Sequence, residues 1–400
     1  MRTFSLPPWP PPRSPPGFAA YHARFGATLV NRLGGVVEPF LALYLAHRDL
    51  PVAQIGLIVA LSGLGSLLGQ LAGGVIADRI GRRQAFAIGM TGAAASFALL
   101  GAADATWLLV VGGFLAGGFT DFYRPASSAL VHDLVSAADR PRAYGLLFWA
   151  INLGFAAGAT LAGALAERGF GLLFALDGAT CLACAAIIWR FVPPGTEPPR
   201  AADEPGRLRD VLADRLMVVF CLVVALQATV YMQSFSTLPL AMSEDGLGPS
   251  DYGVAIALNG VLIVVLQPLA LPRLGRLRRR DALAGGGALI ALGMGIEGLT
   301  PTLVAYALPV VIWTAGEILV TSVAPATVAD LAPAHLRARY QAVFGTAFSG
   351  AFIVAPAAGA ALLDAAGGRA LWGACGAVGI AGALGQLALG PAIARRTDGQ

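Results

Sequence analysis

The chain has 400 residues, of which 56% are hydrophobic and only 12% are charged, and its mean hydropathy is +0.71. Soluble domains carry roughly 25% charged residues, so this composition excludes an ordinary soluble globular protein. The formal net charge is +4, but all 27 basic residues are arginines that gather in short segments between apolar runs. That placement is typical of membrane topology and not of a nucleic-acid surface.

The N-terminal segment 1–17 is too rich in proline to be the apolar core of a signal peptide, and we expect a disordered cytoplasmic tail. Apolar stretches then recur along the chain, each long enough to cross a ~30 Å hydrocarbon core at ~1.5 Å rise per residue. They predict an all-α membrane protein with twelve transmembrane helices, at 19–46, 52–76, 84–104, 106–133, 141–166, 169–192, 215–241, 251–274, 282–299, 302–329, 338–363 and 369–391.

The two halves of the chain align with each other at a constant offset of 197 residues. At this offset Arg79 aligns with Arg276, and Asp133 aligns with Asp330. Because each unit has an even number of crossings, we expect two six-helix bundles of like orientation around a central interface. The expected domains are a tail at 1–17, an N-terminal bundle at 18–192, a cytoplasmic linker at 193–214, a C-terminal bundle at 215–392 and a tail at 393–400.

The distribution of arginines predicts the orientation. If both termini are cytoplasmic, 22 arginines lie at the inner side, and only Arg48, Arg168 and Arg369 lie in outer loops. Arg32 and Arg124 fall within helices. Under the positive-inside rule we therefore expect both termini in the cytoplasm, with the protein in the cell's inner (plasma) membrane.

A glycine- and arginine-rich loop follows the second expected helix. It reads Gly73-Gly74-Val75-Ile76-Ala77-Asp78-Arg79-Ile80-Gly81-Arg82-Arg83. This loop resembles the signature loop of the major facilitator superfamily, whose fold is two pseudo-symmetric six-helix bundles. The resemblance implies a latch in which Asp78 pairs with the neighbouring arginines and with a helix N-terminus of the other half. The alternative is that the arginines only set topology, but topology alone would not require Asp78 or Gly81.

Charged residues inside the expected helices are candidate functional groups, because an unpaired charge in hydrocarbon costs several kcal/mol. Asp121 and Arg124 stand three residues apart on one helix face. Arg124 lies about 14 Å and Arg32 about 16 Å from the cytoplasmic side, at ~1.5 Å per residue. In the superfamily fold the first and fourth helices, which carry Arg32 and the Asp121–Arg124 pair, line the central cavity. The resemblance therefore implies an Arg32–Asp121–Arg124 cluster. A structural ion pair within the first bundle is the alternative.

Two acidic residues, Glu38 in the first expected helix and Glu317 in the tenth, have mainly apolar sequence neighbours. Burial favours the neutral form of a carboxyl, so each is a candidate for proton coupling or cation recognition. A neutral, hydrogen-bonded structural Glu is the alternative. Further polar and aromatic residues could either line a substrate cavity or pack between helices: Gln227, Tyr231, Gln233, Trp149 and Asn259.

The fifth expected helix carries Asn152, Gly154, Gly158 and Gly163, a pattern similar to the glycine-rich motif of twelve-helix drug:proton antiporters. The pattern departs from that motif at Ala159 and Ala162, and the second half supplies Pro356 and Gly359 at the matching positions. Close helix packing through small residues accounts for these glycines in either case.

The resemblance implies a secondary transporter that moves a small molecule by alternating access, with proton-coupled multidrug efflux as the first interpretation. A proton-coupled importer of a sugar, acid or peptide is the alternative within transport. A non-transporting membrane sensor or assembly factor is the alternative outside it. We expect no enzymatic activity, no cofactor, no metal and no nucleic acid. The expected partners are a small-molecule substrate, protons and the lipid bilayer, and the expected state is a monomer.

Overall fold

The computed structural model describes residues 31, 34–127, 140–192, 208–274, 277–297, 299, 301–333 and 336–397. These residues are almost entirely helical and include no strand. The helices of the first half are α2 (Val37–His47), α3 (Val52–Ile80), α4 (Arg82–Ala102), α5 (Thr106–Phe122), α7 (Arg140–Ala166) and α8 (Gly171–Phe191). Those that follow are α9 (Leu208–Leu212), α10 (Arg215–Tyr231), α11 (Gln233–Ser236), α12 (Leu238–Glu244), α13 (Pro249–Leu274), α14 (Arg279–Gly295), α15 (Leu303–Leu331) and α16 (Arg337–Thr397).

Seven helices within the described residues are long and apolar enough to cross a bilayer. One of them, Arg339–Arg396, is 58 residues long and is interrupted at Gly367, where φ is 76° and ψ is 173°. That length suffices for two crossings, since one crossing needs about 20 residues. The protein is therefore a multi-pass helical membrane protein, and the count of twelve crossings stays a prediction.

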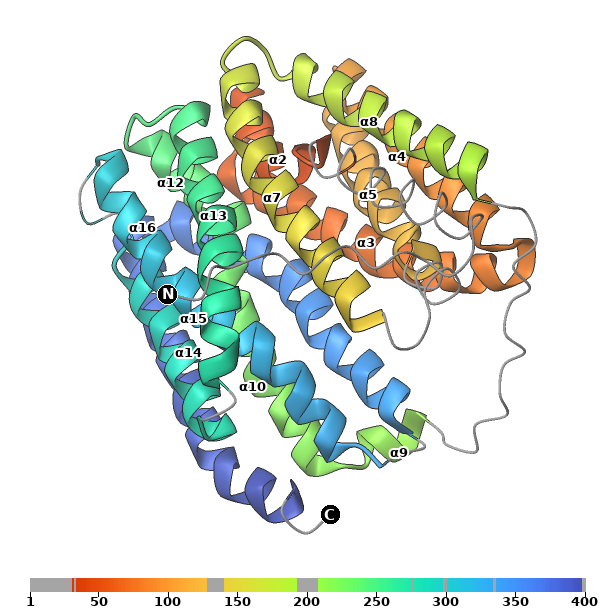
Figure 1. Ribbon diagram of the computed structural model, residues 1–400. Helices are drawn as coiled ribbons and strands as arrows, with labels where there is room; N and C mark the ends of the chain where they lie inside the picture. The colour runs from red at the N-terminus through yellow and green to blue at the C-terminus, as the bar shows by residue number, and fades with distance from the viewer. Residues whose placement is uncertain are drawn as a thin grey trace, which may run out of the picture.

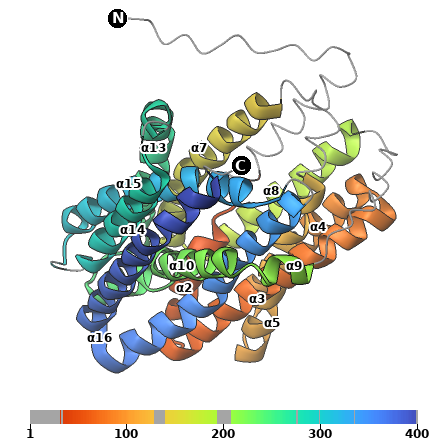
Figure 2. The same cartoon turned by 90° about the horizontal axis from the view of Figure 1, so that it is seen from below.

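The helices form two groups that lie side by side (Figures 1 and 2). In the first half, α5 packs against α3 and α4, and α4 packs against α8. In the second half, α14 packs against α15 and α16, and α10 packs against α16. The contacts between the groups are made mainly by α7 with α13 and by α3 with α16. Figure 2 shows α13, α14 and α15 on one side and α3, α4 and α5 on the other.

The internal repeat seen in the sequence recurs in the positions at which helices begin. α3, α4, α5 and α7 begin at residues 52, 82, 106 and 140, and α13, α14, α15 and α16 begin at 249, 279, 303 and 337. Each start in the second set lies 197 residues after its counterpart. The same local sequence signals therefore start the helices in both halves.

Two of the expected helices are broken at matching positions. The first turns at Gly35 and Val36, before α2 begins. The seventh, expected to run without interruption over 215–241, turns at Met232 and again at Thr237, which separates α10, α11 and α12. Gly35 and Met232 lie 197 residues apart, so both halves break their first helix at the same point of the repeat.

The fourth expected helix is interrupted where the sequence predicts one continuous helix to residue 133. α5 stops at Phe122, the chain turns at Tyr123, and residues 124–127 are helical again. Pro125 accounts for the interruption, because proline has no N–H to donate to a carbonyl group of the preceding turn. Residues 128–139 lie outside the described part of the chain.

Close backbone approaches between the two halves lie toward the upper side in Figure 1, where the chain turns at 48–51, 167–170 and 245–248. A Cβ added at Gly163 of α7 would lie 2.8 Å from the carbonyl oxygen of Pro249. A Cβ at Gly253 of α13 would lie 2.6 Å from the carbonyl oxygen of Ala159. Glycine therefore allows α7 and α13 to touch along their backbones.

Candidate functional site

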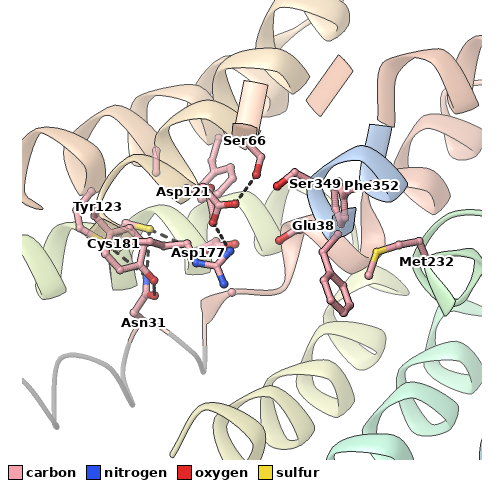
Figure 3. A pocket seen from close by; sticks show the side chains of 17 residues that line it. Asn31, Glu38, Ser66, Asp121, Tyr123, Asp177, Cys181, Met232, Ser349 and Phe352 are labelled. Atoms are coloured by element: carbon pink, nitrogen blue, oxygen red, sulfur yellow. Dashed lines mark hydrogen bonds and ion pairs between the residues drawn. The ribbon is translucent and has the colours of Figure 1, made fainter. Parts of the chain in front are cut away.

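A cavity of about 400 Å³ lies between the two halves (Figure 3). This volume falls within the range of ~300–1,000 Å³ that is typical of small-molecule sites. Helices of the first half supply most of the wall, and α16 together with Met232 supplies the rest. The polar part of the wall includes Asn31, Glu38, Ser66, Thr120, Asp121, Tyr123, Arg124, Asp177 and Ser349, and the large apolar part includes Met90, Phe97, Met232, Phe348 and Phe352.

Asp121 and Arg124 form an ion pair at the cavity wall, with 3.0 Å between Arg124 Nη1 and Asp121 Oδ1. The side chain of Asp121 is 20% exposed and that of Arg124 is 52% exposed. Ser66 of α3 donates its hydroxyl to the other carboxylate oxygen of Asp121. The turn at Tyr123 does not prevent the i, i+3 contact that the sequence predicts. Arg32, the third expected member of this cluster, lies outside the described residues.

Glu38 lies in the same cavity, between Asp121 and the α16 residues Ser349 and Phe352 (Figure 3). It is near enough to Arg124 for electrostatic attraction. The sequence neighbours of Glu38 are mainly apolar, but its neighbours in space include polar and charged groups. The polar residues around it are remote in sequence, so its sequence context could not show them.

Asp177 of α8 accepts hydrogen bonds from the backbone N–H groups at the break in the first helix. Its Oδ2 accepts hydrogen bonds from the backbone N–H groups of Val36 at 3.3 Å and Val37 at 3.1 Å. The residue is only 2% exposed. A buried carboxylate at a helix N-terminus both caps the helix and complements its dipole.

Glu317 lies apart from this cavity, within the second half. Tyr231 of α10 donates its hydroxyl to Oε1 at 2.9 Å, and Asn259 of α13 donates Nδ2 to Oε2 at 2.7 Å. Asn259 Nδ2 also lies 2.9 Å from the hydroxyl oxygen of Thr314. The immediate neighbours of Glu317 are thus polar and come from three helices, whereas the sequence predicted apolar surroundings.

The other residues expected to line a cavity have different positions. Gln233 donates Nε2 to the carbonyl oxygen of Ala355 at 2.9 Å, inside the second half. Gln227 is 2% exposed and pairs with Gln386 of α16 at 3.3 Å. The side chain of Trp149 lies outside the described residues.

The glycine- and arginine-rich loop joins α3 to α4. Gly81 has a φ of 96°, a backbone conformation that favours glycine. Arg82 is 6% exposed, and the guanidinium of Arg83 lies 4.3 Å from the centre of the Trp189 ring. Arg79 is exposed. The side chain of Asp78 lies outside the described residues, so the expected latch stays a prediction.

Three glycines form a stripe on α3, and the signature loop identified in the sequence contains only the last of them, Gly73. Gly65, Gly69 and Gly73 stand four residues apart, and a Cβ on any of them would overlap a backbone carbonyl oxygen of α5. Gly74 differs, because a Cβ there would lie 3.9 Å from the nearest side chain. The four-residue period was the available signal, since small residues at this spacing bring membrane helices together.

The helix-packing motif lies at the contact between the halves. Gly163 faces the start of α13, and a Cβ at Gly260 would lie 3.1 Å from the carbonyl oxygen of Asn152. A Cβ at Gly56 of α3, in the first half, would lie 2.7 Å from the carbonyl oxygen of Pro356 in α16, and Gly359 of α16 faces Gln233. Gly154 and Gly158 are buried in α7.

Known proteins resemble this chain over most of its length. Multidrug resistance protein MdtH of Citrobacter koseri is 29% identical over 285 residues, which cover 70% of each chain. A Na(+), Li(+), K(+)/H(+) antiporter of Planococcus maritimus is 23% identical over 367 residues, which cover 83% of this chain and 86% of that protein.

Solved structures show the same fold. A peptide transporter POT in complex with sulfate has a TM-score of 0.78 at 17% identity. The superposition covers 96% of this chain and 97% of the chain of that transporter. A mutant form of the nucleoside transporter NupG has a TM-score of 0.79 at 12% identity, with coverages of 94% and 99%. The sequence profile of the Major Facilitator Superfamily matches residues 25–351 and 234–397. The chain therefore belongs to the Major Facilitator Superfamily and is a membrane transporter.

Proposed function

We propose that this transporter exports cationic, amphipathic small molecules in exchange for protons. The observation that carries the proposal is the cavity between the halves, in which Glu38, Asp121 and Arg124 stand beside large apolar side chains. When both acids are ionised, these three groups leave one negative charge in excess. A cation is the ligand that such a site favours.

The apolar wall favours an amphipathic ligand over a small hydrophilic one. Phe97, Phe348 and Phe352 offer aromatic surface to a cation or to an apolar ring. Met90 and Met232 are flexible side chains that adapt to ligands of different shape. Two relatives, a multidrug resistance protein and a Na(+), Li(+), K(+)/H(+) antiporter, support this ligand class.

Alternating access follows from the arrangement of the halves. We propose twelve crossings in two six-helix bundles, 18–192 and 215–392, with both termini and the linker 193–214 in the cytoplasm. The close approaches of α7 to α13 and of α3 to α16 lie on the side that this orientation makes external. The structure then corresponds to a state that is closed to the outside. Rocking of one bundle against the other would open that side and close the cytoplasmic one.

Protons drive the exchange in this proposal. A proton that enters from outside neutralises Glu38 or Asp121, which weakens the hold of the cavity on a cation and releases it. Glu317, which lies apart from the cavity, is a further candidate for carrying the proton. Loss of the proton to the cytoplasm restores the charge. The latch of Asp78 with its arginine partners belongs to the same cycle, since it would hold the cytoplasmic ends of the two halves together in the outward-facing state.

The test uses purified full-length protein in proteoliposomes with an imposed pH gradient and tetraphenylphosphonium as the probe. We expect the probe to move against the proton gradient. Glu38→Gln and Asp121→Asn should each lower transport at least tenfold. Asp104→Asn is the matched control, because its carboxylate is fully exposed and Asp104 does not line the cavity. Its transport rate should be unchanged.

Two other outcomes would contradict the proposal. Accumulation of a sugar, acid or peptide together with protons, without exchange of the cation, would indicate an importer. Proton and probe fluxes equal to those of empty liposomes would indicate a sensor or assembly factor that kept the fold.

A further inference from the structure

The break in the seventh helix lies directly between Glu317 and the cavity. α10 ends at Tyr231, Met232 forms a turn, and α11 begins at Gln233. The hydroxyl of Tyr231 bonds Glu317, and Met232 lines the cavity opposite Asp121 (Figure 3). A single peptide bond therefore separates the partner of a buried carboxyl from a residue of the cavity wall.

The same segment contacts the neighbouring helices on both sides. Phe235 of α11 packs against Tyr231, with 5.7 Å between ring centres, and against Phe155 of α7 in the other half at 6.3 Å. Gln233 is bonded to the backbone of Ala355 in α16. A displacement of Tyr231 would therefore reach α7 and α16, because closely packed side chains cannot move independently.

The hydrogen bonds of Glu317 depend on whether it carries a proton. Both of its oxygens accept hydrogen bonds, which suits a carboxylate. Asn259 Nδ2 uses its two hydrogens on Glu317 and Thr314, so it cannot become an acceptor there. The hydroxyl of Tyr231 can either donate or accept. A proton on Glu317 therefore reverses or breaks the bond to Tyr231.

Among the described residues, few titratable groups lie near Glu317. Tyr231 of α10 is in contact with it, and Tyr252 of α13 lies near Tyr231. Glu297, beyond the end of α14, is bonded to the indole of Trp313, one helical turn from Glu317 on α15. Within the described part of the chain, no ion pair involves Glu317.

We infer that the protonation state of Glu317 sets the geometry of the break at Met232, with Tyr231 as the positioning residue between the proton and the cavity wall. The inference rests on the proposed proton-coupled function and names the way in which the proton acts. It makes the seventh helix the element through which the proton and the substrate influence each other.

The test measures the shape of the break without any substrate. Met232→Cys is introduced into full-length protein from which Cys181, Cys184, Cys221 and Cys375 have been removed, and maleimide labelling is followed in proteoliposomes from about pH 5 to 9. We expect the labelling rate to change several-fold in one single-proton transition. Glu317→Gln should abolish the transition. Tyr231→Phe should move its midpoint up by about one pH unit, because the carboxylate loses a hydrogen-bond donor.

Tyr252→Phe is the matched control. The hydroxyl of Tyr252 donates to the carbonyl oxygen of Ser234 at 3.1 Å, so it supports the same segment without bonding Glu317. We expect this variant to keep the wild-type midpoint. An equal shift in both tyrosine variants, or a transition that persists in Glu317→Gln, would overturn the inference. Neither result bears on whether the wild-type protein exchanges tetraphenylphosphonium for protons. If the wild-type protein shows the pH transition but no exchange, the proposed function alone is refuted.

Discussion

Asp214 joins three separate parts of the second half. It caps the N-terminus of α10, accepting from the backbone N–H of Met217 at 3.3 Å. It also accepts from the hydroxyl of Tyr340 at 2.7 Å and from Arg396 Nη1 at 2.6 Å, near the two ends of α16. Burial opposes the charged form of Asp214, but the hydrogen bonds from Tyr340, Arg396 and Met217 outweigh it and hold the pKa of this carboxyl below its usual value.

This cluster predicts a pH-dependent contribution to stability. Because the folded pKa of Asp214 is lowered, its contribution is complete above about pH 4 and is lost as the pH falls through the folded value. Asp214→Asn should lower stability at pH 7 by about 1–3 kcal/mol, measured by thermal unfolding in detergent. The difference from wild type should shrink below about pH 4. Asp281→Asn, which removes an exposed ion pair with Arg280, is the control and should change stability little. A constant difference at every pH would contradict this assignment.

At the residue scale, the sequence supplied candidates but not their partners. The pairing of Asp121 with Arg124 was predictable because both residues lie on one helical turn. Ser66 and Tyr231 are 55 and 86 residues away from the carboxylates they bond. Such contacts arise only when the helices have packed, so hydropathy and spacing could not reveal them.

Among the elements, α3 and α5 depend on backbone contact. At Gly65, Gly69 and Gly73 there is no room for a side chain, because the carbonyl oxygens of α5 occupy that space. Without a hydrophobic force between helices in lipid, such close packing is a main source of association.

The glycine stripe predicts a contrast between neighbouring positions. Gly69→Ala should destabilise the protein by about 1–3 kcal/mol, because the added methyl group forces the α5 backbone away. Gly74→Ala, five residues later on the same helix, should be tolerated, since a Cβ there has 3.9 Å of clearance. Thermal unfolding of the two variants in one detergent makes the comparison. Equal stability of both variants would show that α3 and α5 do not rely on this contact.

Helix boundaries were largely predictable at this scale, but interruptions were not. Charged residues, Gly and Pro placed the starts of α3, α4, α5 and α13 within a few residues. The turn at Met232 has no proline or glycine beside it, and it is supported instead by side chains of other helices. The interruption at Tyr123 was readable in principle from Pro125, which we took to lie inside one continuous helix.

For the whole molecule, the contact of α7 with α13 is the part that the proposed rocking motion would open. Gly163 and Ser250 face each other there, and a Cβ at Gly163 would lie 2.8 Å from the Cα of Ser250. The sequence predicted small-residue packing for Gly163, but not that the packing joins the two halves. The repeat itself was fully readable, because its offset is the same in sequence and in helix starts.

A cross-link at this contact tests the rocking motion. Glu167→Cys together with Gly248→Cys, in a background without the native cysteines, should form a disulfide on oxidation, because a Cβ at Gly248 would lie 3.6 Å from the carboxylate of Glu167 and meets no backbone atom. We expect transport of tetraphenylphosphonium to stop on oxidation and to return with a reductant. Each single variant should transport equally under both conditions. Full transport by the cross-linked protein would mean that this interface stays closed throughout the cycle.

The breaks at Gly35 and Met232 occupy one position of the repeat, yet their supports differ. Asp177 holds the first through backbone N–H groups, which can only donate, so no rearrangement of donors and acceptors can invert that bond. The second is held through a phenol whose role is reversible. The helix break is thus present in both halves, but only the second copy is held by a hydrogen bond whose direction can change. During a transport cycle the first bundle would keep its shape, and the second bundle would bend at Met232.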